Sequence, residues 1–169
     1  MLEQVKKSLT SQYEGSLCML RDCIAACRDD LYDGMIAHGS FRYIAYHTLF
    51  FTDLYLSPTE GAFTLRGIHQ TGGDERGDGL SPGVPKDQLL PYVQACREKA
   101  IDVVANETEQ SLAGPSGFSW RNCSRLELHI YNIRHVQHHT GQLSAYLRRV
   151  DESIGQRRDV MKWIGWGWR

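Results

Sequence analysis

The sequence has no long apolar run. No stretch approaches the roughly 20 consecutive apolar residues that a membrane-spanning helix needs. The opening segment MLEQVKKSLT also lacks the apolar core and the cleavage-site pattern of a secretory signal. We therefore expect a cytoplasmic protein that makes no contact with a membrane.

The sequence also lacks an excess of charge of either sign. Lys and Arg number 19, Asp and Glu number 20, and the formal net charge is -1. Without a basic surface the chain cannot neutralise a phosphate backbone, so nucleic-acid binding is not expected. We expect a small-molecule partner instead.

The cysteines lack the spacing of a disulfide or zinc-ribbon framework. There are five of them, an odd number, and no two form a C-x-x-C pair. This usage is typical of reduced thiols in a protein core. We therefore assign neither a structural metal nor a disulfide to Cys18, Cys23, Cys27, Cys96 and Cys123.

What the chain does contain is helical periodicity. Its 169 residues and 41% hydrophobic content suit a single domain over residues 1–169 with a core of its own. In four segments apolar residues recur every three or four positions, the spacing of amphipathic helices. Ser40 precedes the second segment, and Ser124-x-x-Glu127 opens the fourth with capping-box spacing. The pattern predicts helices over residues 2–33, 40–57, 86–113 and 124–150.

The predicted connections indicate the topology of an all-α four-helix bundle. Short links join helices one and two, and helices three and four, so each pair is expected to be antiparallel. Pro58 to Pro85 contains seven glycines and no periodic pattern. This long crossover loop lets helices two and three run parallel, which gives an up-down-down-up bundle. We expect the loop to lie over one end of the bundle and to be more mobile than the helices.

Two further features concern the outside of the bundle, which we place at about residues 1–150. A second apolar strip of Leu126, Ile130 and Ile133 lies opposite the histidine-bearing face of helix four, and a homodimer interface is the simplest use for it. The tail, residues 151–169, is rich in tryptophan. We expect it to cover the bundle or a subunit contact.

Three histidines are the strongest candidates for a site. His135 and His139 are four residues apart, so they project from one face of helix four, and that face is otherwise apolar. His47 lies in the middle of the apolar face of helix two, whereas His138 projects away from the inward face. Buried imidazoles need partners for their ring nitrogens, and a metal is one such partner. The alternative is that these are core histidines bonded to neighbouring protein groups.

The three imidazole ligands narrow the choice of metal ion. Imidazoles suit zinc, nickel, copper or iron(II), whereas calcium and magnesium prefer oxygen ligands. We favour nickel or zinc as the divalent transition metal. Three protein ligands leave a position for water or substrate, and the ion can then lower the pKa of a bound water to about 7 or deprotonate a thiol.

Residues that support the histidines are harder to assign. Asn132 and Gln142 lie about one turn from the pair and are candidates to orient a ligand or bind substrate. Tyr43 and Tyr146 can offer hydroxyl groups, although packing in the core is the alternative for both. No general base can be identified, so the catalytic residues stay unknown. We expect surface or loop positions for the remaining histidines, His38, His69 and His129.

The segments YIAYHTLFFTDLYL and NIRHVQHHTGQL together resemble the DinB-like superfamily of metalloenzymes, which has one histidine on helix two and H-x-x-x-H on helix four. The resemblance covers roughly residues 1–150. It implies an up-down-down-up bundle, often dimeric, with a divalent metal bound by His47, His135 and His139. Thr140 departs from the basic residue that many relatives carry at this position.

The resemblance leaves several functions open. Relatives include S-transferases and isomerases that depend on low-molecular-weight thiols such as bacillithiol, mycothiol or glutathione. The sequence thus predicts a metal-dependent enzyme acting on a small molecule, with thiol-dependent S-transfer as one reaction. A metal-dependent hydrolase and a noncatalytic metal- or ligand-binding dimeric bundle are the alternatives.

Overall fold

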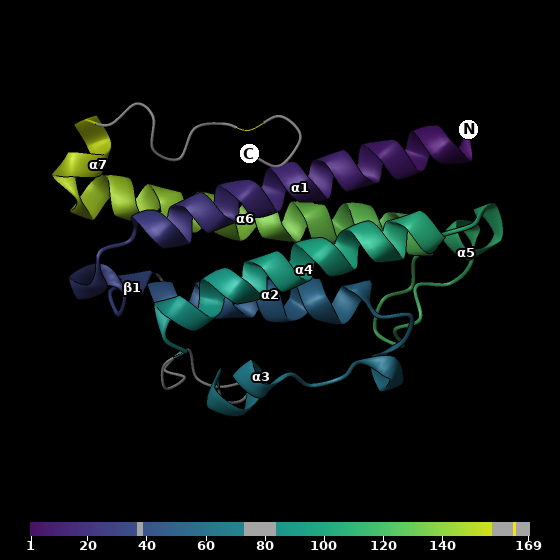
Figure 1. The fold of residues 1–169 in the computed structure, drawn as a ribbon, viewed down its shortest axis with the longest axis horizontal. Helices are drawn as coiled ribbons and strands as arrows, with labels where there is room; N and C mark the ends of the chain where they lie inside the picture. Colours follow the sequence, from purple (N-terminus) through teal and green to yellow (C-terminus); the bar gives the residue numbers. More distant parts are fainter. Residues whose placement is uncertain (37–38, 73–83, 157–163, 165–169) are drawn as a thin grey trace.

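Four long helices form the body of the protein in the computed structural model (Figure 1). The structure describes residues 1–36, 39–72, 84–156 and 164. The long helices bury one apolar face each, as their periodicity predicts. They are α1 (Leu2–Ala26), α2 (Phe41–Leu56), α4 (Lys86–Asn106) and α6 (Arg125–Val150).

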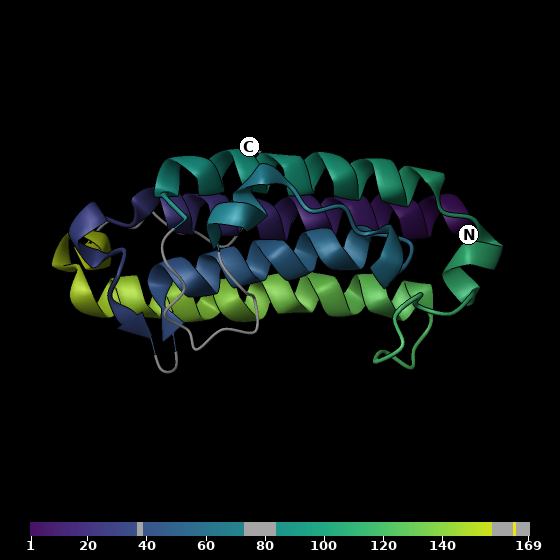
Figure 2. The same cartoon turned by 90° about the horizontal axis from the view of Figure 1, so that it is seen from below.

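The four helices pack as an all-α bundle, and this fold class was predicted. Helix α1 contacts α4 and α6, and α2 contacts the same two helices. In Figure 1, α1 and α6 run in one direction along the bundle, and α2 and α4 run in the other. Figure 2 shows α2 and α6 side by side along most of their length. This helix pair carries the three candidate histidines.

Short elements connect the long helices. A 3-10 turn, η1 (Asp29–Leu31), and a two-stranded antiparallel hairpin join α1 to α2, and a second 3-10 turn and a short helix follow α2. The remaining short elements are β1 (Met35–Ile36), β2 (Gly39–Ser40), η2 (Glu60–Ala62), α3 (Gly67–Gly72), α5 (Glu109–Ala113) and α7 (Glu152–Gln156).

Two predicted helix ends were wrong. Helix α1 ends at Ala26 instead of near residue 33, because Cys27 is extended and the aspartates that follow favour the turn η1. Helix α4 ends at Asn106 instead of residue 113. There the side chain of Thr108 accepts a hydrogen bond from the backbone of Ser111 and starts α5. The predicted starts at Ser40 and Ser124 agree with the structure, since each side chain caps its helix.

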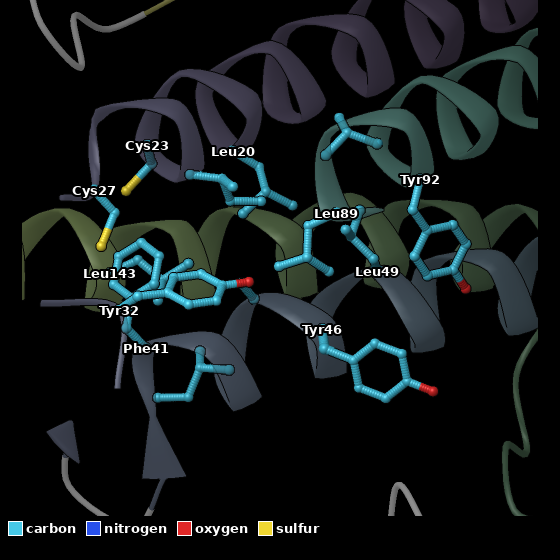
Figure 3. Packing of buried hydrophobic residues seen from close by; sticks show 14 of the residues in the cluster. Leu20, Cys23, Cys27, Tyr32, Phe41, Tyr46, Leu49, Leu89, Tyr92 and Leu143 are labelled. Atoms are coloured by element: carbon cyan, nitrogen blue, oxygen red, sulfur yellow. The ribbon is translucent and has the colours of Figure 1, made fainter. Parts of the chain in front are cut away.

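The main core draws on all four long helices (Figure 3). Leu20, Leu49, Leu89 and Leu143 come from α1, α2, α4 and α6 respectively, and all four are fully buried. The five cysteines are free thiols, and all but Cys123 are buried. Burial of this extent stabilises the fold through the hydrophobic effect and close packing.

The apolar strip opposite the histidine face packs largely against other residues of the same chain. Leu126 and Ile133 pack on a second core cluster, beside Leu2 and Val5 of α1. Ile130 alone of the strip is exposed, at 48%. The strip therefore gives little support to a homodimer, which stays a prediction.

Some predictions fall on parts that the structure describes incompletely. Residues 73–83 of the predicted crossover loop lie outside the described residues, as do Trp163, Trp166 and Trp168 of the tail and His38. No helix among the described residues is long and apolar enough to cross a membrane.

Candidate metal centre

His47, His135 and His139 converge between α2 and α6. One ring nitrogen of each lies within 4.8 Å of the corresponding nitrogens of the other two. The ring centroids of His135 and His139 are 4.6 Å apart, and that of His47 lies 5.5 Å and 5.0 Å from them. All three side chains are half-buried. The helical register argued from the sequence thus places the three rings in one cluster.

The spacing is somewhat wider than a bound ion requires. Two metal–nitrogen bonds of about 2.1 Å at a tetrahedral angle place the nitrogens about 3.4 Å apart. The rings would therefore have to approach one another by up to about 1.4 Å to hold one ion. The donor set of three imidazoles, with no carboxylate in the cluster, fits a divalent transition metal and does not fit calcium or magnesium.

His135 is held neutral by its surroundings. Burial, together with the neighbouring rings of His139 and His47, lowers the pKa of His135 to about 3. Its buried Nδ1 has no hydrogen-bond partner among the described residues. A neutral imidazole is the form that binds a metal, so His135 is in the metal-binding form at neutral pH.

Gln142 orients His139. The Oε1 atom of Gln142 lies 2.8 Å from Nδ1 of His139. An amide oxygen only accepts hydrogen bonds, so the hydrogen of the ring is on Nδ1 and the lone pair is on Nε2. This contact leaves Nε2 as the ring nitrogen available to an ion, and the supporting role of Gln142 stays a prediction.

The other predicted supporting residues have different positions. Asn132 is buried and donates from Nδ2 to the carbonyl oxygen of Thr52, at 3.1 Å, so it ties α6 to α2. Tyr43 packs beside His47, with ring centroids 5.9 Å apart. The structure does not bring Tyr146 to the histidines, because its hydroxyl group donates to the carbonyl oxygen of Leu31.

A cleft of about 1310 Å³ opens beside the histidine cluster. Its walls come from α2, α6, the segment after α2 and the loop before α6. His138, which is exposed, also lines the cleft but does not belong to the cluster of three. Aromatic rings form much of the lining, notably Phe50, Phe51, Tyr55, Phe63, Trp120 and Tyr131. An open, mostly aromatic cleft next to a metal-ligand cluster suits a small organic molecule.

The prediction for His69 was wrong, because this residue is buried. Its Nδ1 accepts a hydrogen bond from the backbone of Arg66, and Nε2 lies 2.8 Å from the hydroxyl of Tyr92. Tyr92 in turn donates to Asp53, which is fully buried and paired with Arg66 and Lys99. Burial raises the pKa of Asp53, but the hydrogen bonds from its two cationic partners outweigh this and lower the pKa overall. The cluster fixes the segment after α2 as one wall of the cleft.

The prediction for His129 was also wrong. It is buried, with Nδ1 3.0 Å from the hydroxyl of Tyr13 and Nε2 3.0 Å from the carboxylate of Glu107. Burial lowers the pKa of His129 more than Glu107 raises it, so the contact with Glu107 is a hydrogen bond from a neutral ring. This arrangement uses both ring nitrogens, and the residue lies outside the lining of the cleft. Its role is structural.

Comparison with known proteins gives one match. None of the curated proteins and none of the solved structures matches the chain. The model of the DinB family matches residues 15–151, a span that includes α2, α6 and all three clustered histidines. Because this match covers most of the sequence, the chain belongs to the DinB family.

Proposed function

We propose that the protein is a metal-dependent enzyme that transfers a low-molecular-weight thiol to a small molecule. The observation that carries the proposal is the convergence of His47, His135 and His139 at the wall of an open cleft. These residues would hold a divalent transition metal, with nickel or zinc favoured by the all-imidazole ligand set. When bound, the metal supplies Lewis acidity, which favours the thiolate form of a thiol in the cleft.

The chain's own groups provide binding and orientation. Gln142 holds the ring of His139 through Nδ1, and Asn132 fixes the spacing between the two histidine-bearing helices. The aromatic lining excludes water from part of the cleft and offers surface to the body of a substrate. A thiolate held there displaces a leaving group from an electrophilic carbon, so a C–S bond forms as the bond to the leaving group breaks.

The ready ionisation of a thiol is the reason to prefer thiol transfer over hydrolysis. A hydrolase of this type needs a carboxylate or a histidine to accept a proton from water. Among the described residues of the lining, Glu60 and His138 could take this role, and both lie outside the cluster of three histidines. A thiol, with an ordinary pKa near 8.5, needs less help to ionise than water does. A noncatalytic metal-binding bundle is the outcome if no reaction is found.

The test combines metal content with a thiol screen. The purified protein, stripped with EDTA and refilled with nickel or zinc, is expected to hold about one ion per chain by elemental analysis. The refilled protein is then incubated with monochlorobimane and bacillithiol, mycothiol or glutathione, and the fluorescent adduct is followed. Adduct formation that requires both metal and His139 supports the proposal. A rate equal in wild type and His139→Ala refutes it.

A further inference from the structure

The two arginines of the cleft lack the carboxylate partner that most of the described arginines outside it have. Elsewhere in the described chain, six arginines form ion pairs with carboxylates, namely Arg21, Arg28, Arg42, Arg66, Arg97 and Arg125. Arg121 and Arg134, which both line the cleft, have no carboxylate at ion-pair distance among the described residues. Among the described residues of the lining, Glu60 is the single acid, so these residues carry an excess of positive charge before any metal is bound.

Arg121 is held in place by two tyrosines. Its Nη2 donates to the hydroxyl of Tyr55 at 2.9 Å and to the hydroxyl of Tyr131 at 2.7 Å. The guanidinium also lies over the ring of Tyr131, 4.3 Å from the centroid. Tyr131 stacks in turn on His135, with an interplanar angle of 10°. The cation and the histidine cluster therefore share one wall of the cleft.

The loop that carries Arg121 is itself well fixed. The backbone nitrogen of Arg121 donates to the carbonyl oxygen of Phe118, and its carbonyl oxygen accepts from the hydroxyl of Ser116 at 2.7 Å. Gly117 has a φ of +88°, and a β-carbon there would overlap with the carbonyl oxygen of Pro58. The position of the guanidinium is thus preorganised, and its charge is not neutralised by the protein. Such a cation attracts an oxyanion strongly, because charge-assisted hydrogen bonds exceed neutral ones in strength.

We propose that Arg121 is the anchor for an oxyanion, a carboxylate or a phosphate group, on the small molecule that occupies the cleft. The aromatic lining takes the apolar body of that molecule, and the histidine cluster lies on the same wall, next to Tyr131. The inference names a substrate class for the proposed function and rests on it in that respect. Binding at Arg121 itself requires no metal, so the two can be tested separately.

The experiment measures binding of three probes to the EDTA-treated protein. These are 4-fluorobenzoate, phenylphosphonate and the neutral 4-fluorobenzamide, with fluorine NMR for the fluorinated probes and competition for the phosphonate. At least one of the two oxyanions is expected to bind tenfold or more tightly than the amide, and the tighter of the two identifies the group. Arg121→Gln is expected to weaken oxyanion binding on the order of 10- to 100-fold and to leave amide binding unchanged.

Two variants complete the design. Arg149→Gln removes the same charge from an exposed position on α6 that does not line the cleft, and it is expected to bind all three probes as wild type does. Arg121→Lys keeps the charge without the planar fork and is expected to prefer oxyanions still, but with lower affinity. If Arg121→Gln does not fold, Arg121→Lys replaces it in the comparison with wild type.

Three outcomes overturn the proposal. The first is equal affinity of the wild type for the oxyanions and the amide, and the second is an equal loss of oxyanion affinity in Arg121→Gln and Arg149→Gln. The third is oxyanion binding that appears only after zinc is added and persists in Arg121→Gln. The last would make the metal the anion site. Failure of the protein to bind a metal would refute the proposed function and leave the result at Arg121 standing.

Discussion

Removal of individual residues around the histidine cluster separates metal ligands from neighbouring groups. Three variants, His138→Ala, His139→Ala and Gln142→Ala, change residues within a span of five on α6. His139 is in the cluster, Gln142 accepts a hydrogen bond from its ring, and His138 is exposed beside it. We expect metal affinity to fall most for His139→Ala, less for Gln142→Ala and hardly at all for His138→Ala.

The magnitudes follow from these contacts. Loss of the group that orients a ligand histidine typically costs 10- to 100-fold in metal affinity, or about 1.4 to 2.8 kcal/mol, which sets the range for Gln142→Ala. His139→Ala removes a ligand and leaves two imidazoles, so its loss should exceed 100-fold. The fold should survive, because alanine favours helices and the core clusters do not include this half-buried ring.

Competition with a chromophoric chelator measures the affinity for zinc and nickel, elemental analysis gives the bound metal, and far-UV circular dichroism reports helicity. An order in which His138→Ala loses more metal than His139→Ala would show that the helical register is wrong. Unchanged affinity in all three variants would rule out the three-histidine site. If Gln142→Ala alone had no effect, its contact with Nδ1 of His139 would not matter for binding.

Four further predictions concern stability and assembly. Asp53→Asn should lower the free energy of unfolding by about 2 to 3 kcal/mol, less than for a fully buried pair because its cationic partners are partly solvated. Since the pKa of Asp53 is lowered in the folded protein, the stabilisation by Asp53 is present above pH about 4 and is lost as the pH falls further. Denaturation curves of wild type and variant should therefore converge in acid. Leu20→Ala, in the main core, should cost about 2 to 5 kcal/mol in urea denaturation and leave zinc affinity unchanged, whereas a shift in affinity would mean that core and site are coupled. Gly117→Ala should cost more than about 1 kcal/mol in the same assay, because its positive φ and its contact with Pro58 exclude a β-carbon, and an unchanged stability would contradict that backbone geometry. The homodimer is tested by light scattering, where Ile130→Arg should shift a dimer toward monomer if the exposed part of the strip is the interface.

The sequence was sufficient to predict which helix face carries each histidine, because this follows from local rules. Ser40 and Ser124 cap α2 and α6, and a period of 3.6 residues then determines which side chains share a face. His135 and His139 need only this register to be neighbours. Gln142 is one turn from His139 on the same helix, so it could be selected as a candidate in the same way.

The features that the sequence did not reveal depend on contacts between distant parts of the chain. His129 meets Tyr13, 116 residues away, and His69 meets Tyr92, 23 residues away. No period within one helix predicts such pairs, so the sequence indicated surface or loop positions for both histidines. Arg121 is in a loop without periodicity, and its place in the cleft follows from the turn at Gly117 and the hydrogen bonds of Ser116.

The relative position of the two histidine-bearing helices depends on one further residue far from the cluster. Arg125, the first residue of α6, is buried and donates through Nη1 and Nη2 to the carbonyl oxygens of Tyr55, Leu56 and Ser57 at the end of α2. These carbonyls have no partner within their own helix, and a cation there also complements the helix dipole.

Glu107 stabilises the same arginine, since its carboxylate accepts from Nε of Arg125 at 3.0 Å. His135 follows Arg125 by ten residues, or about 15 Å at 1.5 Å per residue. A shift of α6 along α2 by a fraction of a turn would separate His47 from the pair on α6, and Arg125 and Asn132 oppose that shift at two different levels of the helix pair. The register of α2 against α6 is therefore stabilised by hydrogen bonds that involve none of the three histidines, so the two helices can bring them together before any metal binds.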